Sequence, residues 1–197
     1  LYCDRADSVR RRAVRTTLDE IFSCLTAWLA PVLCFTAEEA WLTRYPSDDD
    51  SVHLRLFPEV PAAWRDDELA AKWEKVRALR RVVTGALEIE RAEGRIGSSL
   101  QAHPIVHAAP DYVAAMAGVD LAEITITSSA TLLEGSGPDD GFTLGDISGV
   151  AVSPALAKGK KCERCWQVLE EVGENDAAGE ICNRCADAVG DVFAAAS

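Results

Sequence analysis

Four cysteines near the C-terminus carry the clearest chemical pattern in this sequence of 197 residues. They form two Cys-x-x-Cys pairs with sixteen residues between them, at Cys162, Cys165, Cys182 and Cys185. Each pair can present two thiolates to one metal ion from a tight turn, and the spacing is typical of a tetrahedral zinc site. Because four sulfur ligands fill the shell of a zinc ion, the pattern predicts one structural zinc and leaves no position for an activated water.

Two other interpretations of these cysteines are a pair of disulfides and a rubredoxin-like iron site. Disulfides are disfavoured because the chain opens with charged residues and not with the apolar run of a secretory signal. The odd total of seven cysteines is also what a reduced cytosolic protein is expected to have. Cys24 and Cys34 stand among apolar residues, so we expect them to be small buried side chains.

The segment that holds the four cysteines is short and has few apolar residues. Domains below roughly 40 residues usually need a metal or disulfides to fold, so zinc binding and folding of this segment are expected to be one event. Five cations lie beside the cysteines in the sequence, at Lys158, Lys160, Lys161, Arg164 and Arg184. Two roles are open for them: they compensate the negative charge of the thiolates, or they contact phosphate groups.

The net charge of −12 argues against a free-standing nucleic-acid-binding protein, because such proteins are usually basic. Seven acids and no Lys or Arg lie between Ile96 and Ala157, whereas positive charge gathers at 10–15, at 72–95 and beside the cysteines. A contact with RNA is therefore expected to be local and assisted by the rest of a larger molecule. Since residue 1 is leucine, we expect the chain to be a piece of a longer protein. No apolar stretch approaches the roughly 20 residues of a membrane-spanning helix.

Helical periodicity dominates the first half of the chain. Ser8 is a suitable N-cap for a helix that Pro31 ends, and Thr36 begins a second helix with a capping box. A third apolar stripe predicts a long helix from Asp66 to Glu93, ended by Gly94. Three tryptophans lie on the apolar faces of these helices, where core packing is favoured over base stacking, namely Trp28, Trp41 and Trp73.

After Gly97 the expected elements become short and mixed in type. They are a strand around Ile105–Val106, a short helix from Asp111 to Met116, a strand from Ala122 to Leu133 and an extended segment from Thr143 to Val152. Pro154 then leads into the cysteine segment.

The predicted fold class is α+β, in three parts at 1–60, 61–154 and 155–197. The first is a helical-bundle portion, the second a long helix with a small mixed α/β domain, and the third a four-cysteine zinc ribbon. None of the three histidines has an acid–base or metal partner at a suggestive spacing, and no phosphate loop, nucleophile elbow or His-Glu-x-x-His motif is present. We therefore predict no catalytic residue in this chain.

Three stretches, in the same order, resemble bacterial isoleucyl-tRNA synthetases. Residues 1–41, LYCDRADSVRRRAVRTTLDEIFSCLTAWLAPVLCFTAEEAW, resemble the end of the helical anticodon-binding domain of that family. Residues 86–102, ALEIERAEGRIGSSLQA, resemble the segment that leads into its small α/β domain. The cysteine ribbon, with KGKKCERCW followed by CNRCADAV, is similar to its C-terminal zinc module.

The resemblance implies that the chain is part of a class I enzyme of the cytoplasm, which joins isoleucine to its tRNA using ATP. The catalytic and editing domains would precede residue 1, because neither the His-Ile-Gly-His nor the Lys-Met-Ser-Lys-Ser type of ATP-site signature occurs here. This region would bind isoleucine tRNA on its anticodon side together with the upstream domains of the same chain. The absent catalytic domain would use the ATP, and the four cysteines would hold the zinc.

Trp166, directly after the second cysteine, matches an aromatic residue that is expected to face the anticodon stem-loop in this family. The other interpretation is that it packs over the zinc turn. An exposed aromatic side chain can stack on a base and stabilise a complex by ~1–3 kcal/mol. The expected tRNA contacts are Trp166, Arg164, Arg184, Lys160 and Lys161.

Two other functions fit part of the sequence. The ribbon also resembles the zinc finger of formamidopyrimidine-DNA glycosylases, whose nucleophile is an N-terminal proline. Leu1-Tyr2-Cys3 does not match that nucleophile, and long helices are foreign to that class. A zinc-stapled protein-interaction module without a nucleic-acid partner is the other possibility, and the net charge of −12 favours it.

Overall fold

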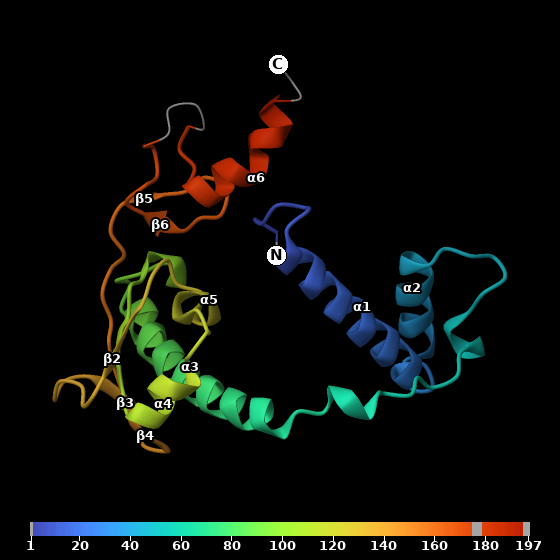
Figure 1. Ribbon diagram of the computed structural model, residues 1–197, viewed down its shortest axis with the longest axis horizontal. Coiled ribbons are helices and arrows are strands. Elements are labelled where there is room, and N and C mark those ends of the chain that lie inside the picture. The colour runs from blue at the N-terminus through green and yellow to red at the C-terminus, as the bar shows by residue number, and fades with distance from the viewer. Residues whose placement is uncertain (1, 175–178, 195–197) are drawn as a thin grey trace. The chain divides into compact units, whose positions relative to one another are not determined.

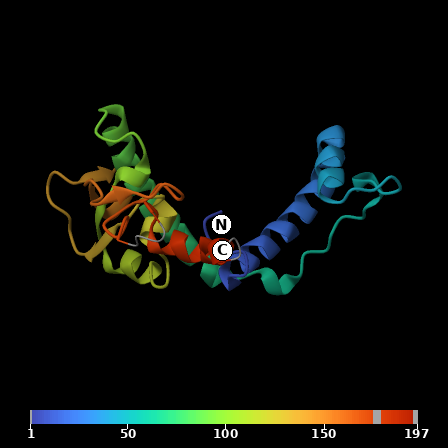
Figure 2. The ribbon, with the colours of Figure 1, turned by 90° about the horizontal axis from the view of Figure 1, so that it is seen from above.

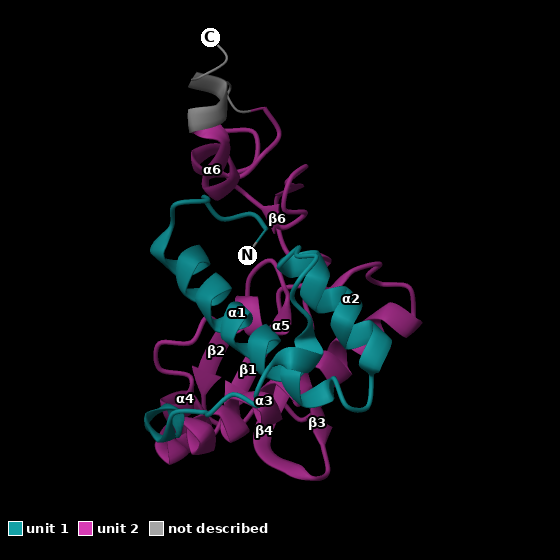
Figure 3. Ribbon diagram, turned by 90° about the vertical axis from the view of Figure 1, so that its right-hand side faces the viewer, with its two compact units in different colours: residues 1–65 teal, residues 66–197 magenta. Residues whose placement is uncertain are grey.

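The computed structural model describes residues 2–174 and 179–194, and side chains up to residue 190 (Figure 1). The chain divides into two compact units, residues 1–65 and residues 66–197, which are coloured separately in Figure 3. Helices and a mixed sheet are both present, so the predicted α+β class is confirmed. None of the described helices combines the length and the apolar character that crossing a membrane requires.

Unit 1 consists of helices and turns, which are α1 (Val9–Leu29), α2 (Cys34–Arg44) and two 3₁₀ turns at Val52–Leu54 and Ala62–Trp64. Ser8 caps α1 as predicted, because its Oγ accepts a hydrogen bond from the N–H of Arg11 at 3.1 Å. The first of these turns, Val52–Leu54, follows α2. In this turn the side chain of Ser51 accepts a hydrogen bond from the N–H of His53.

The start of α2 differs from the predicted capping box at Thr36. The helix begins two residues earlier, because the chain turns directly out of α1 and the N–H of Leu33 bonds to the carbonyl of Leu29 at 2.7 Å. Glu38, within α2, accepts hydrogen bonds from the hydroxyl of Ser51 and from the N–H of Val52. The early start also leaves Cys34 exposed, so the prediction that it is buried is wrong.

An aromatic cluster forms the small core of unit 1. The rings of Phe22 and Trp41 are nearly parallel, with centroids 6.5 Å apart, and Tyr45 tilts against Trp41 at 4.4 Å. Trp41 is buried as predicted, and its indole N–H donates to Asp50. Trp28 is 44% exposed, contrary to the prediction, because its face of α1 meets few side chains within this unit.

Unit 2 is an α/β layer followed by a ribbon, and its helices and strands can be followed from green to red in Figure 2. Its elements are α3 (Asp67–Ala92), a 3₁₀ turn (Ser99–Gln101), β1 (Ile105–Ala108), α4 (Pro110–Ala115), α5 (Leu121–Thr125), β2 (Thr131–Glu134), β3 (Phe142–Leu144), β4 (Ile147–Ser153), β5 (Lys160–Lys161), β6 (Val168–Leu169) and α6 (Asn183–Ala194). The long helix predicted from Asp66 to Glu93 is therefore confirmed, with Asp66 as its N-cap.

Four strands form a mixed sheet in the order β2-β1-β4-β3. β1 runs parallel to β2 and antiparallel to β4, which pairs antiparallel with β3. The apolar stripe of α3 packs against this sheet, and the most deeply buried side chains of the interface include Leu79, Val83, Val106 and Val152. Trp73 lies near the start of α3 and is partly exposed, so it is not the core residue that was predicted.

The strand predicted from Ala122 to Leu133 is wrong over its first half, which forms α5. Asp120 accepts a hydrogen bond from the N–H of Glu123 and caps this short helix, and Ile126 ends it in a left-handed conformation with φ of 57°. The β-branched residues of this stretch suggested a strand, but the local cap and the packing of Leu121 in the core favour a helix. Only Thr131–Glu134 pairs as a strand.

Candidate metal centre

The two cysteine pairs are brought together by different elements. The short antiparallel strands β5 and β6 hold the first pair in the loop that joins them. The second pair straddles the start of α6, with one cysteine directly before the helix and the other in its first turn. Glu171 fixes that helix start, because its carboxylate accepts hydrogen bonds from the N–H and the side-chain amide of Asn183.

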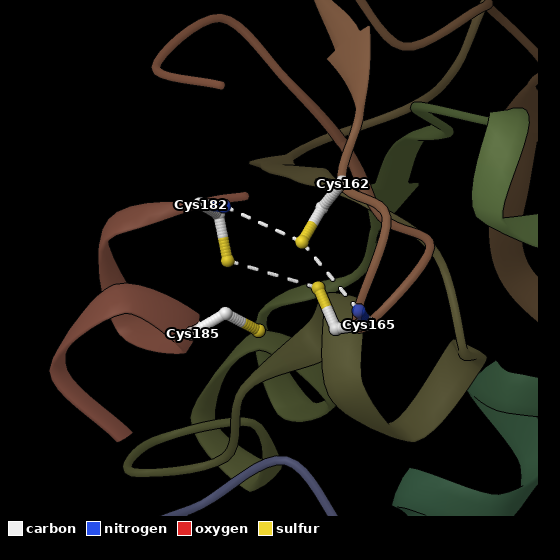
Figure 4. A group of neighbouring side chains, drawn as sticks. All are labelled: Cys162, Cys165, Cys182 and Cys185. Atoms are coloured by element: carbon white, nitrogen blue, oxygen red, sulfur yellow. Dashed lines mark hydrogen bonds between the residues drawn. The ribbon is translucent and has the colours of Figure 1, made fainter. Parts of the chain in front are cut away.

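The four sulfur atoms converge on one point, as Figure 4 shows, and all lie within 4.8 Å of one another. The Sγ atoms of Cys165 and Cys182 are 3.7 Å apart. A zinc ion with four sulfur ligands at about 2.3 Å in tetrahedral geometry holds those sulfurs about 3.8 Å apart, so the cluster fits zinc. All seven cysteines are free, which makes the disulfide interpretation wrong.

The sulfurs are largely buried, and backbone hydrogen bonds to one of them favour its metal-binding form. Cys162, Cys182 and Cys185 are buried, whereas Cys165 is half-buried. The Sγ of Cys162 accepts the N–H of Cys182 at 3.3 Å and the N–H of Cys165 at 3.5 Å. These donors favour the charged thiolate that a zinc ion binds.

The same contacts set the pKa values of the thiols. Burial raises the pKa of Cys162, but the N–H groups of Cys165 and Cys182 outweigh it and lower that pKa to about 6. Burial raises the pKa of Cys182, and it raises the pKa of Cys185 to about 12 against the opposing effect of Arg164. At neutral pH these shifts favour the thiolate of Cys162 and the protonated thiols of Cys182 and Cys185. A divalent cation bound by the four sulfurs would replace those protons.

Two arginines face the sulfurs. Arg164 donates to the Sγ of Cys185 at 3.5 Å. Burial lowers the pKa of Arg184, but its hydrogen bond to Cys165 and the charges of the thiolates outweigh burial and raise it. Arg184 also donates to the side-chain oxygen of Gln167 at 3.3 Å. Both arginines are thus placed to compensate the thiolate charge.

Trp166 and Lys161 form an exposed surface next to the metal centre. The Trp166 side chain is 61% exposed, and the Nζ of Lys161 lies 5.1 Å from the centre of its ring. The backbone of Trp166 has a φ of 68°, which is rare for a residue with a bulky side chain. Its N–H bonds to the carbonyl of Cys162 at 2.9 Å, so the metal-binding turn itself holds this conformation. The tryptophan therefore does not bury itself over the turn.

A cavity of about 200 Å³ opens beside this surface, between the ribbon and the turn after α3. Its lining residues are Gly97, Ser98, Leu100, Gln101, Lys161, Trp166 and Val168. Lys160 is also exposed, with its Nζ 4.0 Å from a carboxylate oxygen of Glu180. Of the five predicted tRNA contacts, four are exposed, namely Trp166, Lys160, Lys161 and Arg184, and Arg164 is half-buried beside the sulfurs.

Three residues that support the centre escaped the sequence analysis. Gln167 accepts a hydrogen bond from Arg184 and contacts the Sγ of Cys165. The backbone of Leu169 lies against Gly159, leaving no room for a side chain there. Ser128 contacts the ribbon from the α/β layer, forty residues away in sequence. Gln167 follows the first cysteine pair closely in the sequence, so its role could have been predicted, whereas nothing in the sequence links Ser128 to the ribbon.

Two family models match the chain. The anticodon-binding domain of tRNA ligase matches residues 1–106, and the zinc finger found in FPG and IleRS matches residues 159–188. The second model covers the ribbon and both cysteine pairs. Together with the clustered sulfurs, it supports one structural zinc ion at this centre.

Curated relatives are similar to nearly the whole chain. An isoleucine–tRNA ligase of Agrobacterium fabrum is 51% identical over 195 residues, which are 98% of this chain and 20% of the relative. Those of Brucella abortus and Caulobacter vibrioides are 53% and 51% identical over 190 residues, which are 96% of this chain and 19% of each relative. The chain thus spans about a fifth of the length of the curated relatives it matches.

Proposed function

Since the chain belongs to the anticodon-binding domain family of tRNA ligases, we propose that it is the tRNA-binding region of an isoleucine–tRNA ligase. It positions isoleucine tRNA on the anticodon side of that molecule. One observation carries this proposal: the anticodon-binding match at 1–106 and the zinc finger match at 159–188 occur in one chain. The relatives named isoleucine–tRNA ligase are similar to nearly all of this sequence, including both matched regions.

The parent protein on this proposal joins isoleucine to its tRNA in the cytoplasm and uses ATP. That chemistry belongs to a catalytic domain outside this sequence, because the ATP-site signatures of class I ligases do not occur in it. The region described here binds and orients, and we assign no catalytic residue to it.

The four cysteines are proposed as the zinc ligands, each through its Sγ. The ion, when bound, would replace thiol protons and fix the turn that carries Trp166. Arg164 and Arg184 would offset the negative charge of the thiolates. They would thereby reduce the repulsion between the metal centre and the phosphates of the RNA. We keep the predicted boundaries near residues 60 and 154 as a proposal for the extent of the three parts.

The cations and the exposed ring beside the cysteines favour this end of the ribbon over residues 96–157 as the part of unit 2 that meets RNA. Residues 96–157 carry seven acids and no Lys or Arg, so that part repels phosphates. Trp166, Lys161 and Lys160 stand exposed on the ribbon and supply a ring for stacking and cations for phosphates. The RNA contact we propose is therefore local.

Unit 1 is proposed to contact other domains of the same parent chain. One face of α1 lines an apolar groove of about 470 Å³ within this unit. Its apolar lining residues are Ile21, Cys24, Leu25, Trp28, Val60 and Trp64. Isolated soluble proteins rarely leave such contiguous apolar surface in water, so this face is suited to a protein contact.

A binding titration tests the function. The zinc-loaded and zinc-stripped chains are titrated with isoleucine tRNA, a non-cognate tRNA and a DNA duplex at two salt concentrations. We expect zinc-dependent preference for isoleucine tRNA. Preference for the duplex would favour a DNA-repair module, and no binding to any nucleic acid at low salt would favour the protein-interaction module.

A further inference from the structure

A run of buried hydroxyl side chains extends from the end of α5 into the segment that leads to β2, on the side of the α/β layer that contacts the ribbon. Among the described residues, the buried polar side chains are Thr26, Thr125, Thr127 and Ser128, and three of these four belong to this run. Thr125 and Thr127 hydrogen bond to each other and to carbonyls of α5. Their bonds are thus satisfied locally, and only Ser128 of the run reaches toward the ribbon.

Ser128 joins three separate segments through one hydroxyl. Its Oγ accepts the N–H of Val168 in β6 at 2.6 Å and donates to the carbonyl of Leu100. A hydroxyl has one donor hydrogen and two acceptor lone pairs, so it can make both bonds at once. The side chain is 6% exposed, so water cannot readily replace it for either partner.

The other side of the ribbon is held where the chain enters it. The N–H of His103 bonds to the carbonyl of Ala155 at 2.7 Å, and the N–H of Ala157 bonds to the carbonyl of Gln101 at 2.8 Å. These contacts fix the incoming segment before β5. Ser128 holds β6, the second strand of the ribbon. The ribbon is therefore held at two places, which restricts its rotation about the segment that enters it.

Val168 is two residues after Trp166, and both line the cavity between the ribbon and the turn of Gly97–Gln101. Leu100, the other partner of Ser128, lies on that turn. The hydroxyl thus sets the distance between the two walls of the cavity.

We infer that Ser128 is a positioning residue, which fixes the ribbon on the α/β layer and so places Trp166 and Lys161 for the RNA. The effect on RNA rests on the proposed function, whereas the effect on the ribbon does not. The ribbon and the Gly97–Gln101 turn act as one composite surface, and the zinc ion alone does not create it.

The test compares Ser128→Ala with Ser129→Ala. Ser129 is the adjacent hydroxyl, but it bonds to His103 inside the α/β layer and not to the ribbon. We expect Ser128→Ala to keep one zinc per chain and to speed hydrogen exchange of the Val168 amide by about 3- to 10-fold, the effect of one lost hydrogen bond. The amide of Val106, in the sheet, should be unchanged, and Ser129→Ala should leave Val168 protected. Equal protection of Val168 in Ser128→Ala and the unsubstituted chain would overturn the inference.

A double-mutant cycle separates positioning from a general loss of stability. Ser128→Ala should weaken isoleucine tRNA binding by about 3- to 10-fold in the unsubstituted chain, but not further in the Trp166→Ala background. An equal loss in both backgrounds would overturn action through Trp166. If Ser128→Ala does not fold, Ser128→Thr tests the inference in its place. This variant keeps the hydroxyl, so the Val168 amide should stay protected from hydrogen exchange. Failure of the unsubstituted chain to bind tRNA would count against the proposed function, and the exchange result would still decide the role of Ser128.

Discussion

Gly159 offers a direct test of how the ribbon is built, through the substitution Gly159→Ala. The residue precedes β5 and has a φ of +109°. A Cβ placed on it would lie 2.2 Å from the carbonyl carbon and oxygen of Leu169 and 2.4 Å from the nitrogen of Glu170. These are backbone atoms, and carbon atoms in contact normally stand about 3.5–4.0 Å apart. The two strands therefore have to separate by more than about 1 Å to admit the methyl group.

The expected loss of zinc affinity follows from the strand pairing that this separation breaks. Pairing of β5 with β6 involves two residue pairs, Lys160 with Leu169 and Lys161 with Val168. Losing two hydrogen bonds costs about 2 kcal/mol, and the positive φ adds about 1–2 kcal/mol for a residue with a Cβ. Because folding of the ribbon and zinc binding are expected to be one event, about 3–4 kcal/mol corresponds to roughly 100- to 1,000-fold weaker zinc binding.

Gly173→Ala is the matched control, because it lies in the same ribbon and also has a positive φ, of +89°. The nearest atom to its added Cβ is the Nζ of Lys160 at 3.5 Å, the end of a flexible side chain. This variant should lose only the free energy of placing a Cβ at positive φ, which corresponds to roughly a tenfold loss of zinc affinity. Competition with a chelator of known affinity measures both variants. Equal zinc affinity of the two would refute the steric argument.

Four further outcomes are expected. Cys165→Ser should release the zinc and unfold the ribbon but not the α/β layer, as metal analysis and circular dichroism would report; full retention of zinc contradicts this. Trp166→Ala should keep the zinc and weaken tRNA binding by ~1–3 kcal/mol, and unchanged affinity would contradict a contact between Trp166 and the tRNA. At pH 7 zinc binding should release the protons of Cys182 and Cys185, whose pKa values are raised, so zinc affinity rises with pH. Calorimetry in buffers of different ionisation enthalpy counts the released protons, and a count of zero would contradict the assignment. Leu79→Ala, at a fully buried position of α3, should lower the stability of unit 2 by about 2–5 kcal/mol in denaturant unfolding, and a neutral result would contradict the packing.

Long elements and local patterns were predictable from the sequence. The apolar stripe of α3 extends over many turns and both ends carry signals, so Asp66 is recognisable as its cap. The cysteine pairs need only short turns to face one metal, and their spacing predicted a cluster that the structure contains. In both cases the residues that determine the structure lie close together in the chain.

Short elements and distant contacts were not predictable in the same way. The segment Leu121–Thr125 has residues that suit a strand, yet a single cap and core packing make it helical. Thr36 has the sequence of a helix start, but the tight turn after α1 begins α2 earlier. Ser128 meets Val168 only because the ribbon folds back on the α/β layer, and no local pattern encodes that contact.

The central claim is that this chain meets isoleucine tRNA on the anticodon side, and separate halves of the tRNA test it most directly. The zinc-loaded chain is bound to labelled isoleucine tRNA at low salt and challenged with either the isolated anticodon stem-loop or an acceptor-stem minihelix. We predict that the anticodon stem-loop displaces the tRNA and that the minihelix does not. Displacement by the minihelix with equal or greater potency would contradict the claim.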